Sequence, residues 1–240
     1  MKQYFILFIL LNFSLNAQNK NNIIITYKYI RLPDTLKSDD INKKNAVKLI
    51  KQAADYAKSY RYVLKVNKNE SFYSVDYGIR PDDIQNPLAY DISKFIAFGS
   101  GSFYQNKFTK QVINYKKTLG KFYAVTDSLN KDWHITNETK YIGKYKVFKA
   151  YLYCESCKQN ITAWFAPELP LPFGPSGFGG LPGLILELKK YKNILKFESI
   201  KFTEKKLKFE LLKEAIPITK EKLESLQWKK RAEMMRRRRN

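Results

Sequence analysis

One short segment constrains the fold of this chain more than any other. Residues 167–183 contain five of the nine prolines and five of the ten glycines. Proline lacks the backbone donor that helices and sheets need, and glycine loses more entropy than other residues when it is ordered. The segment also carries the large apolar residues Leu169, Leu171, Phe173, Phe178 and Leu181. Because disorder would leave these side chains in water, we predict a rigid crossover that folds over the core and leads into a buried strand at 184–188.

A helical spacing of apolar residues occurs in the N-terminal half of the chain. Val47, Ile50, Ala54 and Ala57 recur three and four residues apart, with lysines between them. This spacing predicts an amphipathic helix at about 41–58. Near the other end, Thr219 is a suitable N-cap for a final helix that runs into the C-terminal arginines.

Most of the remaining chain alternates between apolar and polar residues, which is typical of strands with one buried face. The expected strands are 23–30, 60–66, 71–77, 111–117, 121–125, 139–142, 146–153, 161–166, 184–190, 194–202 and 207–212. Residues 78–106 contain prolines and a Gly-Ser run, so we expect a loop there with a short helix at about 91–97. The predicted fold class is α+β and mostly β, with a strongly curved antiparallel sheet or an open barrel and one helix near each end.

The first 17 residues have the composition of a cleavable signal peptide. Lys2 is followed by an apolar run at 4–11 and by the small residue Ala17. The apolar run is shorter than the ~20 residues that cross a bilayer, so a retained anchor is the weaker interpretation. We therefore expect an exported protein that is periplasmic, envelope-associated or secreted. We divide the remainder into a single β-rich domain at 18–218 and a C-terminal helix with a basic tail at 219–240.

The chain is strongly basic, with a formal net charge of +22. Lysines are scattered along the expected strands and alternate with apolar positions, as on solvated sheet faces, so we do not expect a nucleic-acid partner. The segment 228–239 is denser, because it carries seven positive charges and one negative charge and ends in Arg236–Arg239. Two interpretations of this tail stay open: a solvated end, or a contact with an anionic membrane surface or an acidic partner.

The crossover ends in a hexapeptide that resembles a known family motif. Gly180-Leu181-Pro182-Gly183-Leu184-Ile185 spells the name of the GLPGLI family of exported bacterial proteins. The other positions that resemble the family are Trp133, Lys149, Ala150, Trp164, Gly174 and Pro175. Many members carry a cysteine where this chain has Val147, so no disulfide or metal scheme that rests on that cysteine carries over.

The resemblance covers about residues 23–200 in layout, with the specific motifs between Trp133 and Leu188. It implies an exported protein of two-membrane bacteria without an established activity, often encoded beside outer-membrane receptors. It supplies no catalytic residues.

No complete set of residues for catalysis, a metal or a cofactor is expected. His134 is the only histidine, and it is far in sequence from Cys154 and Cys157. A Cys-His site and a zinc site with three or four ligands are therefore both incomplete. Gly99 and Gly101 do not match a dinucleotide- or phosphate-binding loop.

Two functional hypotheses follow. The first is a non-enzymatic binding or assembly protein that holds a lipid, a peptide or an outer-membrane partner on a concave apolar surface or at a sheet edge. The second is a thiol-disulfide redox protein that uses Cys154 and Cys157. A redox pair normally opens a helix, whereas these cysteines lie between two expected strands, which favours the first hypothesis. In an oxidising compartment we expect them to form a structural disulfide at a hairpin tip.

Overall fold

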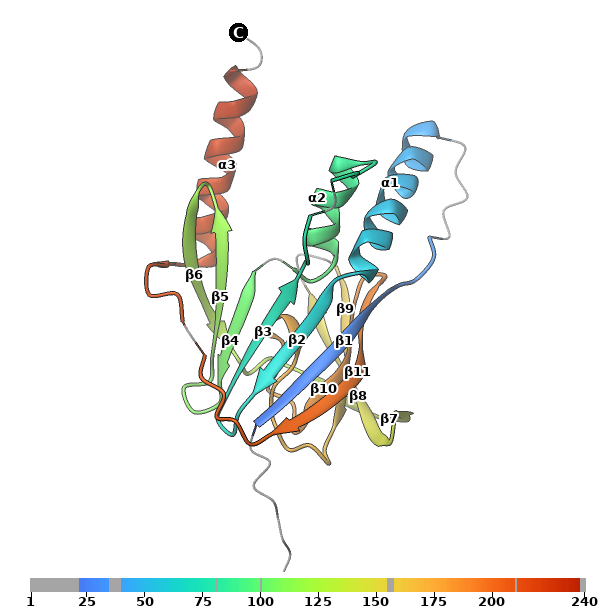
Figure 1. The fold of residues 1–240 in the computed structure, drawn as a ribbon, viewed down its shortest axis with the longest axis vertical. Coiled ribbons are helices and arrows are strands. Elements are labelled where there is room, and N and C mark those ends of the chain that lie inside the picture. The colour runs from blue at the N-terminus through green and yellow to red at the C-terminus, as the bar shows by residue number, and fades with distance from the viewer. Residues whose placement is uncertain are drawn as a thin grey trace, which may run out of the picture.

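The computed structural model describes residues 22–34, 40–80, 82–99, 101–154, 158–209 and 211–237. These residues form one sheet of twelve strands combined with three α-helices (Figure 1). The strands are β1 (Asn22–Arg31), β2 (Arg61–Val66), β3 (Glu70–Asp76), β4 (Ser102–Asn106), β5 (Gln111–Thr118), β6 (Lys121–Ser128), β7 (His134–Ile142), β8 (Tyr145–Cys154), β9 (Gln159–Ala166), β10 (Leu184–Lys190), β11 (Asn193–Thr203) and β12 (Ile216–Ile218). The helices are α1 (Ile41–Lys58), α2 (Pro87–Ile96) and α3 (Lys220–Arg237), with one 3-10 turn, η1 (Pro175–Gly177). The predicted fold class, mostly β within α+β, is confirmed.

The sheet consists of two meanders joined through β1. Its order is β12-β6-β5-β4-β3-β2-β1-β11-β10-β9-β8-β7. Neighbouring strands run antiparallel except β12, which is parallel to β6. Strands β8 to β10 lie behind β1 and β2 in Figure 1, so the sheet curves strongly. Since β12 and β7 remain separate edges, the sheet is not closed into a barrel.

The alternation of the first strands sets the inner and outer faces of the sheet. In β1, Tyr27 and Tyr29 are buried while Lys28 between them is exposed. In β2, Leu64 is buried and Lys65 is exposed. The side-chain period of two therefore places the core on the inner face, as the sequence predicts.

The crossover at 167–183 is ordered and lies inside the curve of the sheet. Its backbone bonds to the start of β10, where Ile185 N donates to Phe173 O at 3.0 Å. Phe173 is buried, and Leu184 and Leu186 of β10 are 0% exposed. The predicted rigid crossover and buried strand are both confirmed.

Gln105 of β4 holds the crossover from the opposite meander. Its Oε1 accepts a hydrogen bond from Ser71 Oγ at 2.7 Å and a longer one from Gly174 N at 3.4 Å. Its Nε2 donates to Phe178 O at 3.0 Å. Because Gln105 is fully buried, these bonds satisfy polar groups that water does not reach.

Helix α1 has the predicted bounds. Asp40 caps its N-terminus, since the carboxylate accepts a hydrogen bond from Asn42 N at 2.8 Å. Figure 1 shows α1 and α2 side by side at one end of the sheet, where the rings of Tyr56 and Tyr90 meet edge to face with centroids 5.5 Å apart.

Residues 78–106 are more regular than predicted. Helix α2 begins earlier than expected because Asn86 caps it, with its side chain accepting from Ala89 N at 3.1 Å. Strand β4 lies between β3 and β5, where we expected a loop. Gly101 has a φ of +127°, and a Cβ there would lie 2.3 Å from Tyr115 O. The glycine therefore permits a close approach to the neighbouring strand rather than a loop.

The strand predicted at 207–212 is wrong over its described residues, 207–209 and 211–212. Strand β11 already has β1 and β10 as neighbours, so no edge is free beside it. Phe209 instead stacks on Phe72 of β3, with ring centroids 6.1 Å apart, and the chain continues to β12 at the other side of the sheet.

The C-terminal helix begins as predicted, because Thr219 Oγ1 accepts a hydrogen bond from Lys222 N at 3.3 Å. The predicted signal peptide at 1–17, Cys157, Arg238 and Arg239 lie outside the described residues. Among the described residues, none of the helices has both the length and the apolar composition of a membrane-spanning segment. The division of the chain at 218 stays a prediction.

Candidate ligand-binding cavity

A cavity of ≈ 1060 Å³ lies between the sheet and α3. Its walls come from β4 to β6, the β8–β9 hairpin, η1, the end of β10, β12 and the first turns of α3. The apolar lining includes Val112, Val125, Leu152, Ile161, Phe178 and Leu223. The charged lining consists of Lys116, Lys131, Lys190 and Lys220 with Asp127, Glu221 and Glu224. We call this site the α3 cavity.

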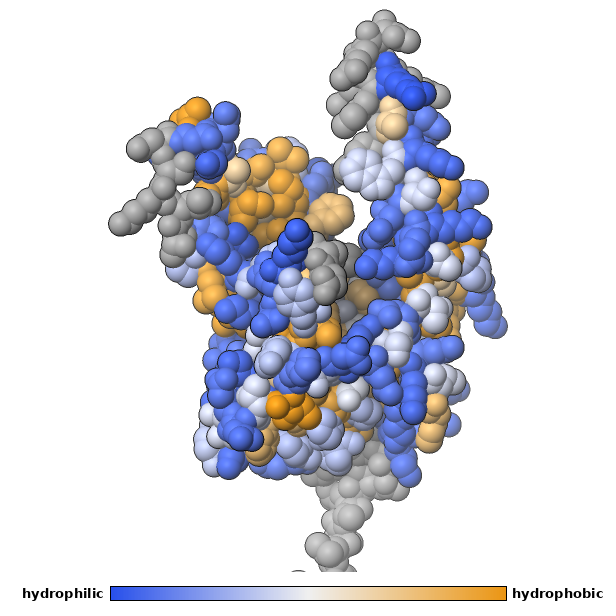
Figure 2. Space-filling view, turned by 180° about the vertical axis from the view of Figure 1, so that it is seen from behind, coloured by the Kyte–Doolittle hydropathy of each residue, from blue (hydrophilic) through white to orange (hydrophobic). Residues whose placement is uncertain are grey.

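Strand β12 and helix α3 form the outer wall of the α3 cavity. Leu223 of α3 is buried and packs with Tyr123 and Val125 of β6. One turn further, Gln227 Nε2 donates to Thr118 Oγ1 at 3.3 Å. These contacts hold α3 alongside β5 and β6, away from α1 and α2 (Figure 1). From behind, the molecule is hollowed at its upper end between α3 and the α1–α2 pair (Figure 2).

The crossover supplies the floor of the α3 cavity. Gly177 of η1 has a φ of +77°, and a Cβ there would lie 2.5 Å from Cδ1 of Phe103 in β4. A glycine is therefore required for η1 to approach the sheet this closely. The next residue, Phe178, lines the cavity and is held through its carbonyl by Gln105.

Lys190 is a partly buried cation of the α3 cavity. Burial lowers the pKa of its ammonium group, and the nearby charge of Lys220 lowers this pKa further. Neither lysine makes an ion pair with a carboxylate in the part of the chain that the structure describes. Two cations thus lie near each other in a cavity whose lining is partly apolar and partly polar.

Asn114 adds an unsatisfied polar group to the same lining. Its side-chain oxygen is buried and accepts no hydrogen bond from the described residues. Since buried polar atoms are normally paired, a ligand or water that donates a hydrogen bond would be stabilised there.

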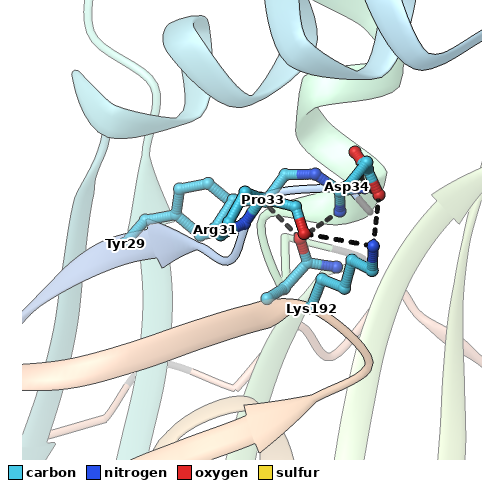
Figure 3. Close-up of polar contacts among 6 residues, drawn as sticks. Tyr29, Arg31, Pro33, Asp34 and Lys192 are labelled. Atoms are coloured by element: carbon cyan, nitrogen blue, oxygen red, sulfur yellow. Dashed lines mark hydrogen bonds and ion pairs between the residues drawn. The ribbon is translucent and has the colours of Figure 1, made fainter. Parts of the chain in front are cut away.

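A second, smaller cavity of ≈ 360 Å³ lies under α1 beside a polar cluster. In this cluster Arg31 bonds to Asp34 at 3.1 Å and to Asn193 Oδ1 at 3.0 Å, and Tyr29 Oη donates to the same oxygen at 2.6 Å (Figure 3). Lys192 Nζ lies 2.8 Å from Asp34 Oδ1 and donates a hydrogen bond to Pro33 O at 3.1 Å. The donors and acceptors of this cluster satisfy one another, so it fixes the end of β1 to the turn before β11.

The residues that resemble the family motif mainly build the core around the crossover. Trp133 Nε1 donates to Gly179 O at 2.8 Å, and Ala150 is fully buried. Lys149 pairs with Glu138 at 2.7 Å on the outer face. Lys140 Nζ lies 4.2 Å from the centroid of the Trp164 ring.

The hexapeptide at 180–185 closes the crossover rather than lining the α3 cavity. Gly180 has a φ of +84°, and a Cβ on Gly183 would lie 2.3 Å from Ala166 O. Leu181, Leu184 and Ile185 are buried, whereas Pro182 is exposed. Gly174 and Pro175 precede the floor at Gly177, so the motif shapes the cavity only indirectly.

The sequence did not single out the lysines of the α3 cavity. They resembled the many lysines of solvated strand faces, and the residues that surround them come from positions between 103 and 227. The signal in the sequence was the pair of lysines that ends the otherwise buried strand β10, of which Lys190 is the second.

The cysteines and the histidine do not form a reactive site among the described residues. Cys154 is the last residue of β8, lines the α3 cavity and is not a free thiol. Cys157 lies outside the described residues, so their pairing stays a prediction. His134 is exposed at the start of β7, where its ring stacks on Tyr151 with centroids 5.2 Å apart. Within the described ranges, no group of three or more His, Cys, Asp and Glu residues is arranged to hold a metal ion.

Comparison with known proteins gives similarity without an activity. A family described as "Protein of unknown function (Porph_ging)" matches residues 152–187, which include the hexapeptide at 180–185. No curated protein matches the chain.

Two crystal forms of PNGF-II are similar in structure, with TM-scores of 0.56 and 0.52. Each is 15% identical in sequence and covers 87% of this chain. The chain spans 33% of the length of those proteins, so the likeness concerns the fold of one part of a longer chain.

Proposed function

We propose that this chain is an exported protein of the cell envelope that binds a ligand in the α3 cavity and does not catalyse a reaction. The observation that carries the proposal is the cavity itself. Its ≈ 1060 Å³ volume lies just above the range of ~300–1,000 Å³ typical of small-molecule sites, and its lining combines apolar side chains with polar and charged ones in similar number. A cavity of this kind supports the hypothesis that the chain binds a lipid, a peptide or an outer-membrane partner.

Export rests on the sequence. The signal-like segment at 1–17 and the resemblance to the exported GLPGLI family support it. N-terminal sequencing of the native protein should begin at Gln18, and an intact Met1 would contradict export by cleavage.

The redox alternative has no support of this kind. Cys154 ends a strand that pairs antiparallel with β9, whereas a low-pKa redox cysteine usually lies at a helix N-terminus.

The test is to purify the mature protein gently from its native envelope and to identify bound molecules by native mass spectrometry. We expect a bound species that is weakened or lost in Thr126→Trp, because Thr126 is an exposed residue of β6 that lines the cavity and a Trp there would fill part of it. The matched control is Thr139→Trp, at an exposed position of β7 outside the cavity. Bare protein in repeated preparations, with no thermal shift on adding lipids or peptides, would refute the binding function.

A further inference from the structure

We infer that the α3 cavity takes a single-chain amphiphile whose anionic head group lies between Lys190 and Lys220 and whose acyl chain contacts the apolar lining. This inference rests on the binding function proposed above and names the chemical class of the ligand. Three features of the cavity support it.

The first feature is positive charge that no ion pair among the described residues neutralises. Lys190 ends β10 with its side chain partly buried, and Lys220 is the first residue of α3. Both lysines line the cavity, and no described carboxylate forms an ion pair with either of them. A partly desolvated cation without a partner is unfavourable, so an anion that enters the cavity gains the interaction that the protein leaves unmade.

The second feature is that two of the three carboxylates in the lining have partners of their own. Asp127 pairs with Lys131 at 2.5 Å. The carboxylate of Glu221 bonds to its own backbone N–H and to the Thr219 side chain; these bonds lower its pKa, and the nearby charge of Lys220 lowers it further. The whole lining holds four lysines against three carboxylates, so it favours an anionic head group over a cationic one.

The third feature is the apolar surface beside these charges. Val112, Leu152 and Ile161 come from the inner face of the sheet, while Phe178 comes from the crossover and Leu223 from α3. An acyl chain gains free energy when its methylene groups leave water, so such a lining is a suitable site for it.

A peptide fits the α3 cavity less well. Extended peptides bind by adding a strand to a free sheet edge. The strands β4, β5, β6, β8, β9 and β10 that line the cavity all have neighbours on both sides. The other lining strand, β12, is an edge of the sheet, but it is only three residues long and Pro217 at its centre has no backbone donor. Apart from the Asn114 side chain, the walls therefore offer few partners to a peptide backbone.

The experiment compares probes that share one chain length and differ in head group. The delipidated mature protein is titrated with palmitate, with 1-palmitoyl lysophosphatidate and with the neutral 1-hexadecanol. We expect each anionic probe to bind about tenfold or more tightly than hexadecanol at physiological salt. The two anionic probes distinguish a carboxylate head group from a phosphate one.

The variant Lys190→Gln tests the position of the head group. It should weaken binding of the tighter anionic probe about tenfold and leave hexadecanol within about twofold. The matched control is Lys189→Gln. Lys189 is the preceding residue of β10 and does not line the cavity, so this variant should change the affinity for neither the anionic probe nor hexadecanol. Thr126→Trp should weaken the binding of all three probes, and this result would locate their binding site in the α3 cavity.

The outcomes separate the inference from the proposed function. Equal binding of hexadecanol and the anionic probes, or equal effects of Lys190→Gln and Lys189→Gln, would overturn the head-group assignment while leaving a binding cavity. If no probe binds but protein from the native envelope carries a peptide that Thr126→Trp displaces, the proposed function stands and this inference falls. If the native protein is bare and no probe binds, both fall.

Discussion

The hydrogen bonds by which Gln105 holds the crossover can be tested by replacing Gln105 with leucine. Gln105→Leu keeps a side chain of similar size but removes the bonds to Ser71 Oγ at 2.7 Å and Phe178 O at 3.0 Å, together with the longer one from Gly174 N. Each buried polar group that loses its partner costs about 1–3 kcal/mol, and the added apolar contact offsets part of this. We therefore expect the free energy of unfolding to fall by about 2–4 kcal/mol.

The assay is equilibrium unfolding in urea, monitored by tryptophan fluorescence, with Gln111→Leu as the control. Gln111 is exposed at the start of β5, so its replacement should change stability by less than about 0.5 kcal/mol. The unfolding midpoint of Gln105→Leu should move while the dependence on urea stays constant. A change in Gln105→Leu as small as in the control would show that the crossover is held by apolar packing alone.

Three further predictions follow from buried and charged positions. Leu186→Ala should lower the free energy of unfolding by about 2–5 kcal/mol, because Leu186 is fully buried in β10; urea unfolding would measure this, and a loss below about half a kilocalorie would contradict the core position. A hydrogen bond from Lys192 is the largest factor that lowers the pKa of Asp34. The pKa of Asp34 is thus lower in the folded state than in the unfolded state, where it is about 4. Asp34 therefore contributes stability above about pH 4, and this contribution is lost as the pH falls through the folded pKa. Asp34→Asn should flatten this part of the stability–pH curve, and an unchanged curve would contradict the pairing. The native protein should show no reactive thiol, and replacing Cys154 and Cys157 together by serine should change stability little because the closed loop is short; a fast-alkylating thiol near neutral pH would support the redox alternative.

Local signals in the sequence were enough to predict the crossover and α1. The crossover contains so many prolines and glycines that neither helix nor ladder fits it, and its apolar residues require a core to cover them. In α1 the apolar spacing alone predicted the bounds 41–58, and the structure shows that Asp40 caps the helix there. Such features depend only on residues near one another in the chain.

Elements that depend on distant partners were harder to predict. β4 is stabilised by β3 and β5 on its two sides, and the glycine before it indicated a loop because its close contact with Tyr115 is not visible in the sequence. The segment at 207–212 has strand-like composition, but the order of the sheet leaves it no adjacent edge. Sheet topology, rather than propensity, decides both cases.

The α3 cavity shows the same dependence, because its walls belong to elements with separate structural roles. Phe178 is held by Gln105 as part of the crossover, and its position also forms the cavity floor. Leu223 packs on β6 to hold α3, and this packing brings Lys220 to the same cavity as Lys190. Loosening the crossover should therefore weaken ligand binding as well as stability, whereas Lys190→Gln should weaken binding without loss of stability. If folded Gln105→Leu protein still binds the anionic probe with wild-type affinity, the cavity floor tolerates movement. The lysines at the head group, Lys190 and Lys220, would then determine the affinity without help from the floor.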